Sequence, residues 1–304
     1  MTVPAKGTAD VTVTVKLSDA LRKELTDTFE NGIYIEGYIT LKQQATAEGV
    51  TGCDLSIPYL AFYGDWDQAP VIDIGYYWQK LQGEPNWASQ YLNYGGSMLS
   101  GTGSFYVFGG NPYAPELAYY PEHNTLSPLR TDGYYDKVDL IYTALLRNAK
   151  SLTYRITDAK TGETYYRKTV DYVGKSVYNA NYDTILPAGS FTSTAIDPWY
   201  GVDSAGEMLK DDTTVIVSID AELDHEGFTA AQNKNAHWEF PVTIDNTPPQ
   251  ILSSTSDGET LTLEVADSRY LAYVEVYDVE HMNVFSEPVF SQGYSSKTLG
   301  ETAT

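Results

Sequence analysis

Two runs of alternating apolar residues, at positions 33–41 and 55–63, constrain the fold of this chain more than any other feature. In both runs the apolar residues recur at every second position, and β-branched and aromatic residues predominate. A polar loop at positions 43–52 separates the runs, which predicts two antiparallel strands joined as a hairpin. Neither run offers a nucleophile or a cluster of metal ligands, so we interpret residues 31–66 as architecture.

Residues 9–17 also alternate and predict a further strand. Ser18 then occupies an N-cap position before a segment whose Leu21, Leu25 and Phe29 have helical spacing, which predicts a short surface helix. The N-terminal part of the chain therefore contains three expected strands, fewer than the about seven of a β-sandwich.

A second block of alternating segments follows in the middle of the chain. The expected strands are residues 137–146, 151–159, 163–173, 213–223 and 236–245. Gly162 stands where a tight turn between two of these strands needs a positive φ. Five strands of this kind would form most of a second β-sandwich.

Two consecutive prolines, Pro248 and Pro249, end this block and predict a stiff joint, because proline cannot sit in a central strand. Beyond the joint we expect short strands at 251–253, 260–265, 271–277 and 283–285, with a turn at Asp257 and Gly258. These strands begin a third sandwich. The polar residues 295–304 are expected to be a frayed tail.

The segment from residue 65 to 124 is rich in aromatic, glycine and proline residues, and predicts loops and short strands that cover a sheet edge. A connection this long is usually functional or a decorated insertion. Its aromatic side chains would either line a groove for a carbohydrate or peptide or serve as structural cover. The residues in question are Trp66, Trp78, Trp87, Tyr76, Tyr77 and Tyr106.

The composition narrows the classes of partner. With 19 Lys and Arg against 41 Asp and Glu, the formal charge is −22, which disfavours nucleic acid and anionic lipid. No apolar run reaches the ~20 residues of a membrane-spanning helix, and no signal peptide is expected at the N-terminus. The single cysteine, Cys53, excludes an internal disulfide and a multi-cysteine zinc site.

Serine-protease chemistry is suggested at one place and then contradicted. Ser97 lies in a Gly-Ser-Met run like that around a subtilisin-type nucleophile, but the glycine-rich residues after it do not predict the helix that such a nucleophile caps. The four histidines, at positions 123, 225, 237 and 281, lie outside the motifs of these enzymes. We expect Ser97 in a turn, His237 as a satisfied histidine, and no enzyme activity in this chain.

Calcium is the cofactor that the chain would most readily accommodate. Carboxylates recur in turns, and an acidic extracellular module meets millimolar calcium. The pairs are Asp65 with Asp67, Asp132 with Asp136, Asp197 with Asp203, and Asp211 with Asp212. Asp132 and Asp136 are the predicted structural calcium ligands; solvated acidic turns are the alternative, and none of the pairs has EF-hand spacing.

The first 66 residues carry a family resemblance. Asn31-Gly32, Glu36-Gly37, the run from Ser56 to Tyr59, and Gly64-Asp65-Trp66 match a specific pattern, with Ala61 in place of a glycine. This pattern resembles the first fibronectin type III-like domain of bacterial subtilisin-like cell-envelope serine proteinases, the lactocepin and complement-peptidase group. The segments 146–150 and 158–162 resemble the second such domain, although residues 129–131 depart from its motif.

The resemblance implies an all-β fold of tandem immunoglobulin or fibronectin type III-like β-sandwiches, the first and last incomplete. The domains would be residues 1–66, 67–247 with the long aromatic insertion, and 248–304. It implies a fragment without the catalytic domain, a spacer and scaffold for that domain at the cell wall, with a role in recognising a protein substrate or wall component. The alternative is a surface adhesion or glycan-binding module using Trp66, Trp78, Trp87 and Tyr106.

Overall fold

The computed structural model describes most of the chain's secondary structure and divides it into two compact units, Met1–Ala69 and Pro70–Thr304. The described residues are 6–43, 49, 52–72, 98–100, 105–107, 124–129, 135–138, 145–181, 184–186, 197–228, 233, 236–271, 273–277, 290–293 and 301–303. Each unit is described by itself.

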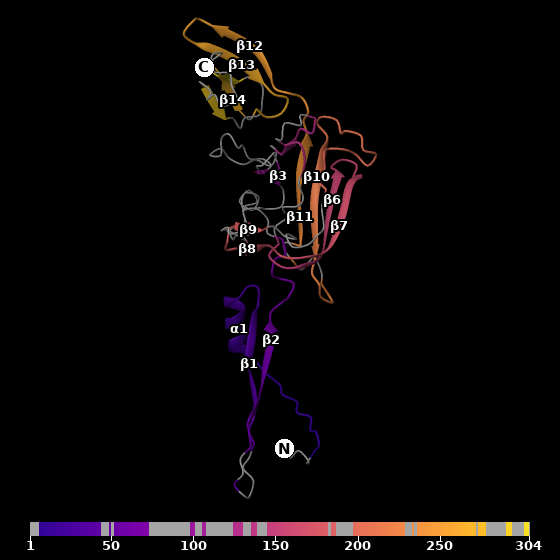
Figure 1. The fold of residues 1–304 in the computed structure, drawn as a ribbon, viewed down its shortest axis with the longest axis vertical. Coiled ribbons are helices and arrows are strands. Elements are labelled where there is room, and N and C mark those ends of the chain that lie inside the picture. Colours follow the sequence, from indigo (N-terminus) through magenta and orange to yellow (C-terminus); the bar gives the residue numbers. More distant parts are fainter. Residues whose placement is uncertain are drawn as a thin grey trace. The chain divides into compact units, whose positions relative to one another are not determined.

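The first unit is a hairpin with one helix beside it (Figure 1). Helix α1 (Asp19–Thr28) begins where predicted, because the Ser18 side chain accepts a hydrogen bond from the Leu21 amide at 3.2 Å. Strands β1 (Ile33–Leu41) and β2 (Leu55–Tyr63) pair antiparallel over their whole length. The predicted helix and hairpin are confirmed.

The predicted strand at residues 9–17 is wrong. These residues form no strand, and Val11, Val13 and Val15 are about half exposed. Alternation alone does not make a strand, because backbone groups need a ladder partner, and the described sheet of this unit contains only β1 and β2.

The second unit is built around a five-stranded sheet in the order β5-β11-β10-β6-β7 (Figure 1). Its strands are β5 (Thr125–Leu126), β6 (Ala149–Asp158), β7 (Thr164–Val173), β10 (Thr214–Glu222) and β11 (His237–Ile244). The four long strands confirm the predicted segments 151–159, 163–173, 213–223 and 236–245. β5 was not predicted; it pairs parallel with β11, more than a hundred residues away.

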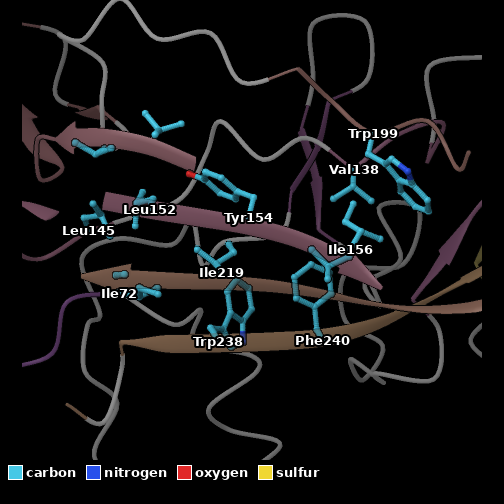
Figure 2. Close-up of a cluster of buried hydrophobic side chains, with 14 of the residues drawn as sticks. Ile72, Val138, Leu145, Leu152, Tyr154, Ile156, Trp199, Ile219, Trp238 and Phe240 are labelled. Carbon is cyan, nitrogen blue, oxygen red and sulfur yellow. The ribbon is translucent and has the colours of Figure 1, made fainter. Parts of the chain in front are cut away.

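One face of this sheet carries the core of the unit (Figure 2). Alternate residues of the central strands are buried, as in the pattern of β10, because successive side chains of a strand point to opposite faces. Among the described segments that pack against this core are those that form the isolated bridges Ile72 to Leu145 and Val138 to Trp199. Of the predicted strand 137–146, the described ends form these bridges and residues 139–144 lie outside the described residues.

The predicted turn between β6 and β7 is confirmed, with Gly162 at φ +73°. Asp158 fixes it by accepting hydrogen bonds from the amides of Lys160 at 2.8 Å and Thr161 at 2.7 Å. These backbone hydrogen bonds hold the pKa of Asp158 below its usual value. The Asp158 carboxylate also accepts a bond from the Tyr165 hydroxyl, and burial together with this bond raises the pKa of Tyr165 to about 12.

The C-terminal part of the second unit holds two small sheets. Strands β12 (Gln250–Ser256), β13 (Leu261–Ala266) and β16 (Glu301–Ala303) form one, and β14 (Tyr273–Val276) pairs with β15 (Phe290–Gly293) in the other. The expected frayed tail is wrong at residues 301–303, because their backbone pairs with β13. The expected strand at 283–285 lies outside the described residues.

Two further hairpins complete the described strands: β3 (Met98–Ser100) with β4 (Phe105–Val107), and β8 (Val177–Asn179) with β9 (Thr184–Leu186). The first lies within the segment for which loops and short strands were predicted. Several sheets and one short helix confirm the all-β fold class. The predicted domain boundaries stay predictions.

Candidate functional site

An aromatic cluster lies on one face of the β1–β2 hairpin. Tyr34 and Phe62 are direct cross-strand neighbours with ring centroids 5.4 Å apart, and Trp66 contacts both rings edge-on, at 6.0 Å and 4.9 Å. Such edge-to-face contacts orient the rings and stabilise the pair beyond simple burial. Tyr34 is 55% exposed and Trp66 42% exposed, so the cluster presents ring surface to solvent.

The exposed apolar surface continues along the same face. Tyr38 lies on this face because it is four positions from Tyr34 on β1. Leu60 lies on it because it is two positions from Phe62 on β2, and side chains at every second position of a strand share a face. Their exposures are 75% and 66%. We call Tyr34, Tyr38, Leu60, Phe62 and Trp66 the aromatic face.

Helix α1 lies against the other face of the hairpin. Tyr63 is on that face, and its hydroxyl lies 3.4 Å from the Thr26 hydroxyl and 3.5 Å from the Arg22 carbonyl oxygen. The aromatic face is therefore not the surface that the helix covers.

Most of the other predicted aromatic residues, Tyr76 and Tyr77 among them, lie outside the described residues. Trp78 and Trp87 lie outside the described residues, and Tyr106 is described only as a backbone position in β4. The groove predicted between these residues and Trp66 stays a prediction. Sequence reasoning missed Tyr34 and Tyr38, although their alternation with Ile33 and Ile35 marks them as the second face of the strand.

The acidic turns mostly satisfy neighbouring backbone groups. Asp65 accepts a hydrogen bond from the Asp67 amide at 2.9 Å, so its carboxylate caps the turn. Asp203 likewise accepts bonds from the amides of Ala205 and Glu207. Among the described residues, no three His, Cys, Asp or Glu side chains are grouped to hold a metal ion.

The predicted calcium ligands fall at the border of the described segments. Asp136 is half-buried in the segment 135–138, and Asp132 lies outside the described residues. The predicted calcium site therefore stays a prediction.

A histidine network lies on the solvent-facing side of the five-stranded sheet. His237 Nδ1 lies 2.7 Å from Asp220 Oδ1, and its Nε2 lies 3.2 Å from Glu239 Oε2. Burial disfavours the charged ring, but the hydrogen bonds and charges of the two carboxylates outweigh it and raise the pKa of His237. His237 was predicted to be a satisfied histidine, and these contacts confirm it.

The joint after β11 is held by an acidic residue from the preceding loop. Asp211 accepts hydrogen bonds from the Asn246 amide at 2.8 Å and the Thr247 hydroxyl at 2.5 Å. The Asn246 side chain in turn accepts a bond from the Leu129 amide at 3.0 Å. Burial opposes ionisation of Asp211, yet these bonds lower its pKa. Side-chain hydrogen bonds therefore hold Asn246 and Thr247 in place, directly before the conformationally restricted Pro248 and Pro249.

Two contacts connect the segment after β13 to the same region. The Ser268 hydroxyl donates to Asp245 at 2.6 Å, and Arg269 pairs with Asp212 at 2.7 Å. Burial raises the pKa of Asp245, and the Ser268 hydrogen bond acts in the opposite direction. With Asp211, these contacts restrain the joint from both sides.

Two of the four histidines, His225 and His237, lie within the described residues, and those at positions 123 and 281 do not. His225 Nδ1 faces the Glu226 carbonyl oxygen, and both ring nitrogens of His237 face carboxylates. Ser97 lies outside the described residues, and the element directly after it is strand β3, not the helix that a subtilisin-type nucleophile caps.

The described elements define an all-β protein with one short helix. A family model described as an Fn3-like domain matches residues 1–60. C5a peptidase of Streptococcus pyogenes serotype M1 is 24% identical over 319 residues, covering 86% of this chain and 25% of that protein. PI-type proteinase of Lactococcus lactis subsp. cremoris is 23% identical over 287 residues, covering 88% of this chain and 13% of that protein.

These similarities confirm the resemblance to cell-envelope proteases that the sequence motifs indicate. The chain spans a quarter of the length of the C5a peptidase and about an eighth of that of the lactococcal proteinase. The shared part contains the Fn3-like domain, which supports an accessory role. Within the described residues, no helix has the length and apolarity needed to cross a bilayer.

Proposed function

We propose that this chain is a non-catalytic accessory region of a secreted, cell-wall-associated, subtilisin-like serine protease. The observation that carries the proposal is the extent of the similarity: 86% of the chain aligns with a C5a peptidase and 88% with a PI-type proteinase. A relationship of this extent involves most of the chain and not one short motif.

In this role the chain is a spacer and scaffold for the catalytic domain at the cell surface. The restrained joint supports a stiff spacer, because Asp211 and Asn246 fix the residues before the two prolines. The aromatic face supports a scaffold role, because exposed apolar patches of this kind on soluble proteins mark interaction surfaces. A protein substrate or a wall component is the further partner we propose.

An exchange experiment tests the scaffold role. The aligned region of the S. pyogenes C5a peptidase is replaced by this chain in one protein and deleted in another, and secretion and thermal inactivation are measured. We expect the exchanged protease to be secreted and to withstand heating better than the deleted one. An exchanged protease that is secreted but inactivates as fast as the deletion would contradict the scaffold role.

Glycan binding is a second candidate, favoured by the exposed rings of Tyr34, Tyr38 and Trp66 on one face. Flat aromatic surfaces bind the apolar faces of sugars, as they bind other ring systems. Binding on a glycan array that is lost in Trp66→Ala and Tyr38→Ala would support it. Tyr277→Ala, which removes an exposed ring outside the aromatic face, is the control. An array without binding would reject this candidate.

A structural calcium ion held by Asp132 and Asp136 completes the proposal. Oxygen ligands in turns are the type that calcium prefers. Calorimetric titration with calcium should release or absorb heat in the wild type and not in Asp136→Asn. Absence of heat, together with a melting temperature unchanged by chelator, would reject the site.

A further inference from the structure

The β6–β7 ribbon differs in charge from the rest of the molecule. Residues 147–175 contain seven Lys and Arg and three Asp and Glu, a formal charge of +4, although the whole chain carries −22. The basic residues are Arg147, Lys150, Arg155, Lys160, Arg167, Lys168 and Lys175. The formal charge of this segment is thus opposite in sign to that of the whole chain, although Lys150 is paired with Glu222 of β10 at 2.7 Å.

Two of these cations face each other directly. Arg155 on β6 and Arg167 on β7 are cross-strand partners, so their side chains share one face, and like charges in this position destabilise a sheet. The face is the solvent-facing one, because the neighbouring residues Tyr154 and Ile156 point into the core.

Among the described residues, one ion pair involves this pair of arginines. Arg155 lies 3.8 Å from Asp220, which is already bonded to His237 at 2.7 Å. Within the described segments, no carboxylate pairs with Arg167 or Lys168. The surface thus presents two adjacent guanidinium groups with capacity for a further anion.

Strand β7 also offers its backbone. It is the last strand of the sheet, with β6 as its neighbour in the described order, and Figure 1 shows it at the outer edge. An edge strand of ten residues presents a row of N–H and C=O groups that another strand can pair with. Residues Thr164, Arg167 and Thr169 are exposed along it. Charged residues on an edge also discourage self-association, and the experiment below separates that role from binding.

We propose that the β7 edge binds an extended acidic peptide segment, which adds a strand to the sheet and places its carboxylates beside Arg155 and Arg167. The adjacent guanidinium groups of Arg155 and Arg167 favour a segment that carries carboxylates over a neutral or basic segment. Alternate residues of an extended peptide lie on one face about 6.6 Å apart, which suits carboxylates at every second position. The binding site does not depend on the proposed protease role, and the two proposals are tested by separate experiments.

The test uses the full chain and fluorescent ten-residue peptides of alternating Thr and Glu or alternating Thr and Lys. In fluorescence anisotropy we expect the Thr-Glu peptide to bind, the Thr-Lys peptide not to bind, and added salt to weaken binding. N-methylation of the threonine amides should reduce binding by roughly tenfold or more, because strand addition needs main-chain donors. Amide exchange should slow in β7 and stay unchanged in β11.

Variants locate the site on the protein. Arg155→Gln with Arg167→Gln should weaken binding of the Thr-Glu peptide by roughly tenfold or more, whereas Lys160→Gln, at the exposed turn of the same ribbon, should change it by less than about twofold. Thermal melting checks that each variant is folded. If the double variant does not fold, the N-methylated and Thr-Lys peptides still test the proposal on the wild type.

Three results would overturn the proposal: no binding of the Thr-Glu peptide, equal binding of its N-methylated form, or equal binding of a heparin oligosaccharide of matched charge. The last two would show that the ribbon attracts negative charge without pairing a strand. No binding of any anion would leave the basic residues as protection of an edge.

Discussion

His237 Nδ1 lies 2.7 Å from Asp220 Oδ1 across strands β11 and β10, and Glu239 approaches the other ring nitrogen. The pKa of His237 is raised in the folded chain, so the folded state binds the proton more tightly than the unfolded state. The resulting stabilisation is complete below the ordinary histidine pKa of about 6.5 and is lost as pH rises through the raised value.

We therefore predict that the wild type loses stability relative to His237→Gln between pH 6 and pH 8.5. The His237 side chain is 48% exposed, and solvent screening limits the difference to at most about 1 kcal/mol. Urea unfolding at both pH values measures it. His225→Gln, whose ring faces a carbonyl oxygen, is the control, and an equal pH dependence in wild type and His237→Gln would contradict the prediction.

The hydrogen bonds of Asp211 predict a stability cost at the joint. Asp211→Ala should lower the free energy of unfolding by about 1–3 kcal/mol, because it removes two bonds from Asn246 and Thr247. Thr247→Val removes one of them and should cost about half as much. Since the pKa of Asp211 is lowered, its contribution is present above the ordinary carboxyl pKa and should fade as pH falls. Unfolding curves at pH 7 and pH 3.5 test both points.

Two glycines with the same backbone conformation should respond differently to alanine. Gly162 has φ +73° and open space where an added Cβ would lie, so Gly162→Ala should cost only the left-handed backbone penalty of about 1 kcal/mol. Gly201 has φ +72°, but an added Cβ would lie 2.7 Å from Pro128 Cγ. Gly201→Ala should therefore cost a further ~1–3 kcal/mol. Equal costs in denaturant unfolding would contradict this account of the two turns.

The buried face of the five-stranded sheet predicts a contrast between two isoleucines. Ile219 is fully buried, and Ile219→Ala should destabilise the chain by about 2–5 kcal/mol. Ile251 is 67% exposed on β12, and Ile251→Ala should change stability by less than about 0.5 kcal/mol. Chemical denaturation of both variants checks that Ile219 is a core residue and Ile251 a surface residue, and similar losses would contradict this assignment.

The fold was predictable where local pattern and pairing agree. The long strands β6, β7, β10 and β11 lie where the sequence alternates, and Ser18 marks the start of α1. Residues 9–17 show the limit, because they alternate without a ladder partner. The pairing of β5 with β11 was invisible, since a two-residue strand has no periodicity.

The candidate sites were less predictable because they depend on contacts between distant residues. Asp211 was noticed as an acidic turn residue, but its partner Thr247 is 36 positions away. His237 and Asp220 meet through strand register, which local pattern does not determine. Arg155 and Arg167 become neighbours by the same kind of pairing, so the sequence alone did not show that two positive charges lie side by side.

The central claim is that this chain is a non-catalytic accessory region, and active-site labelling tests it most directly. The purified chain is incubated with a fluorophosphonate probe for reactive serines and, in parallel, with a denatured protein substrate. The account predicts no labelling and no cleavage, with the folded state verified by melting. Stoichiometric labelling of a serine, together with cleavage that a serine-protease inhibitor abolishes, would contradict it.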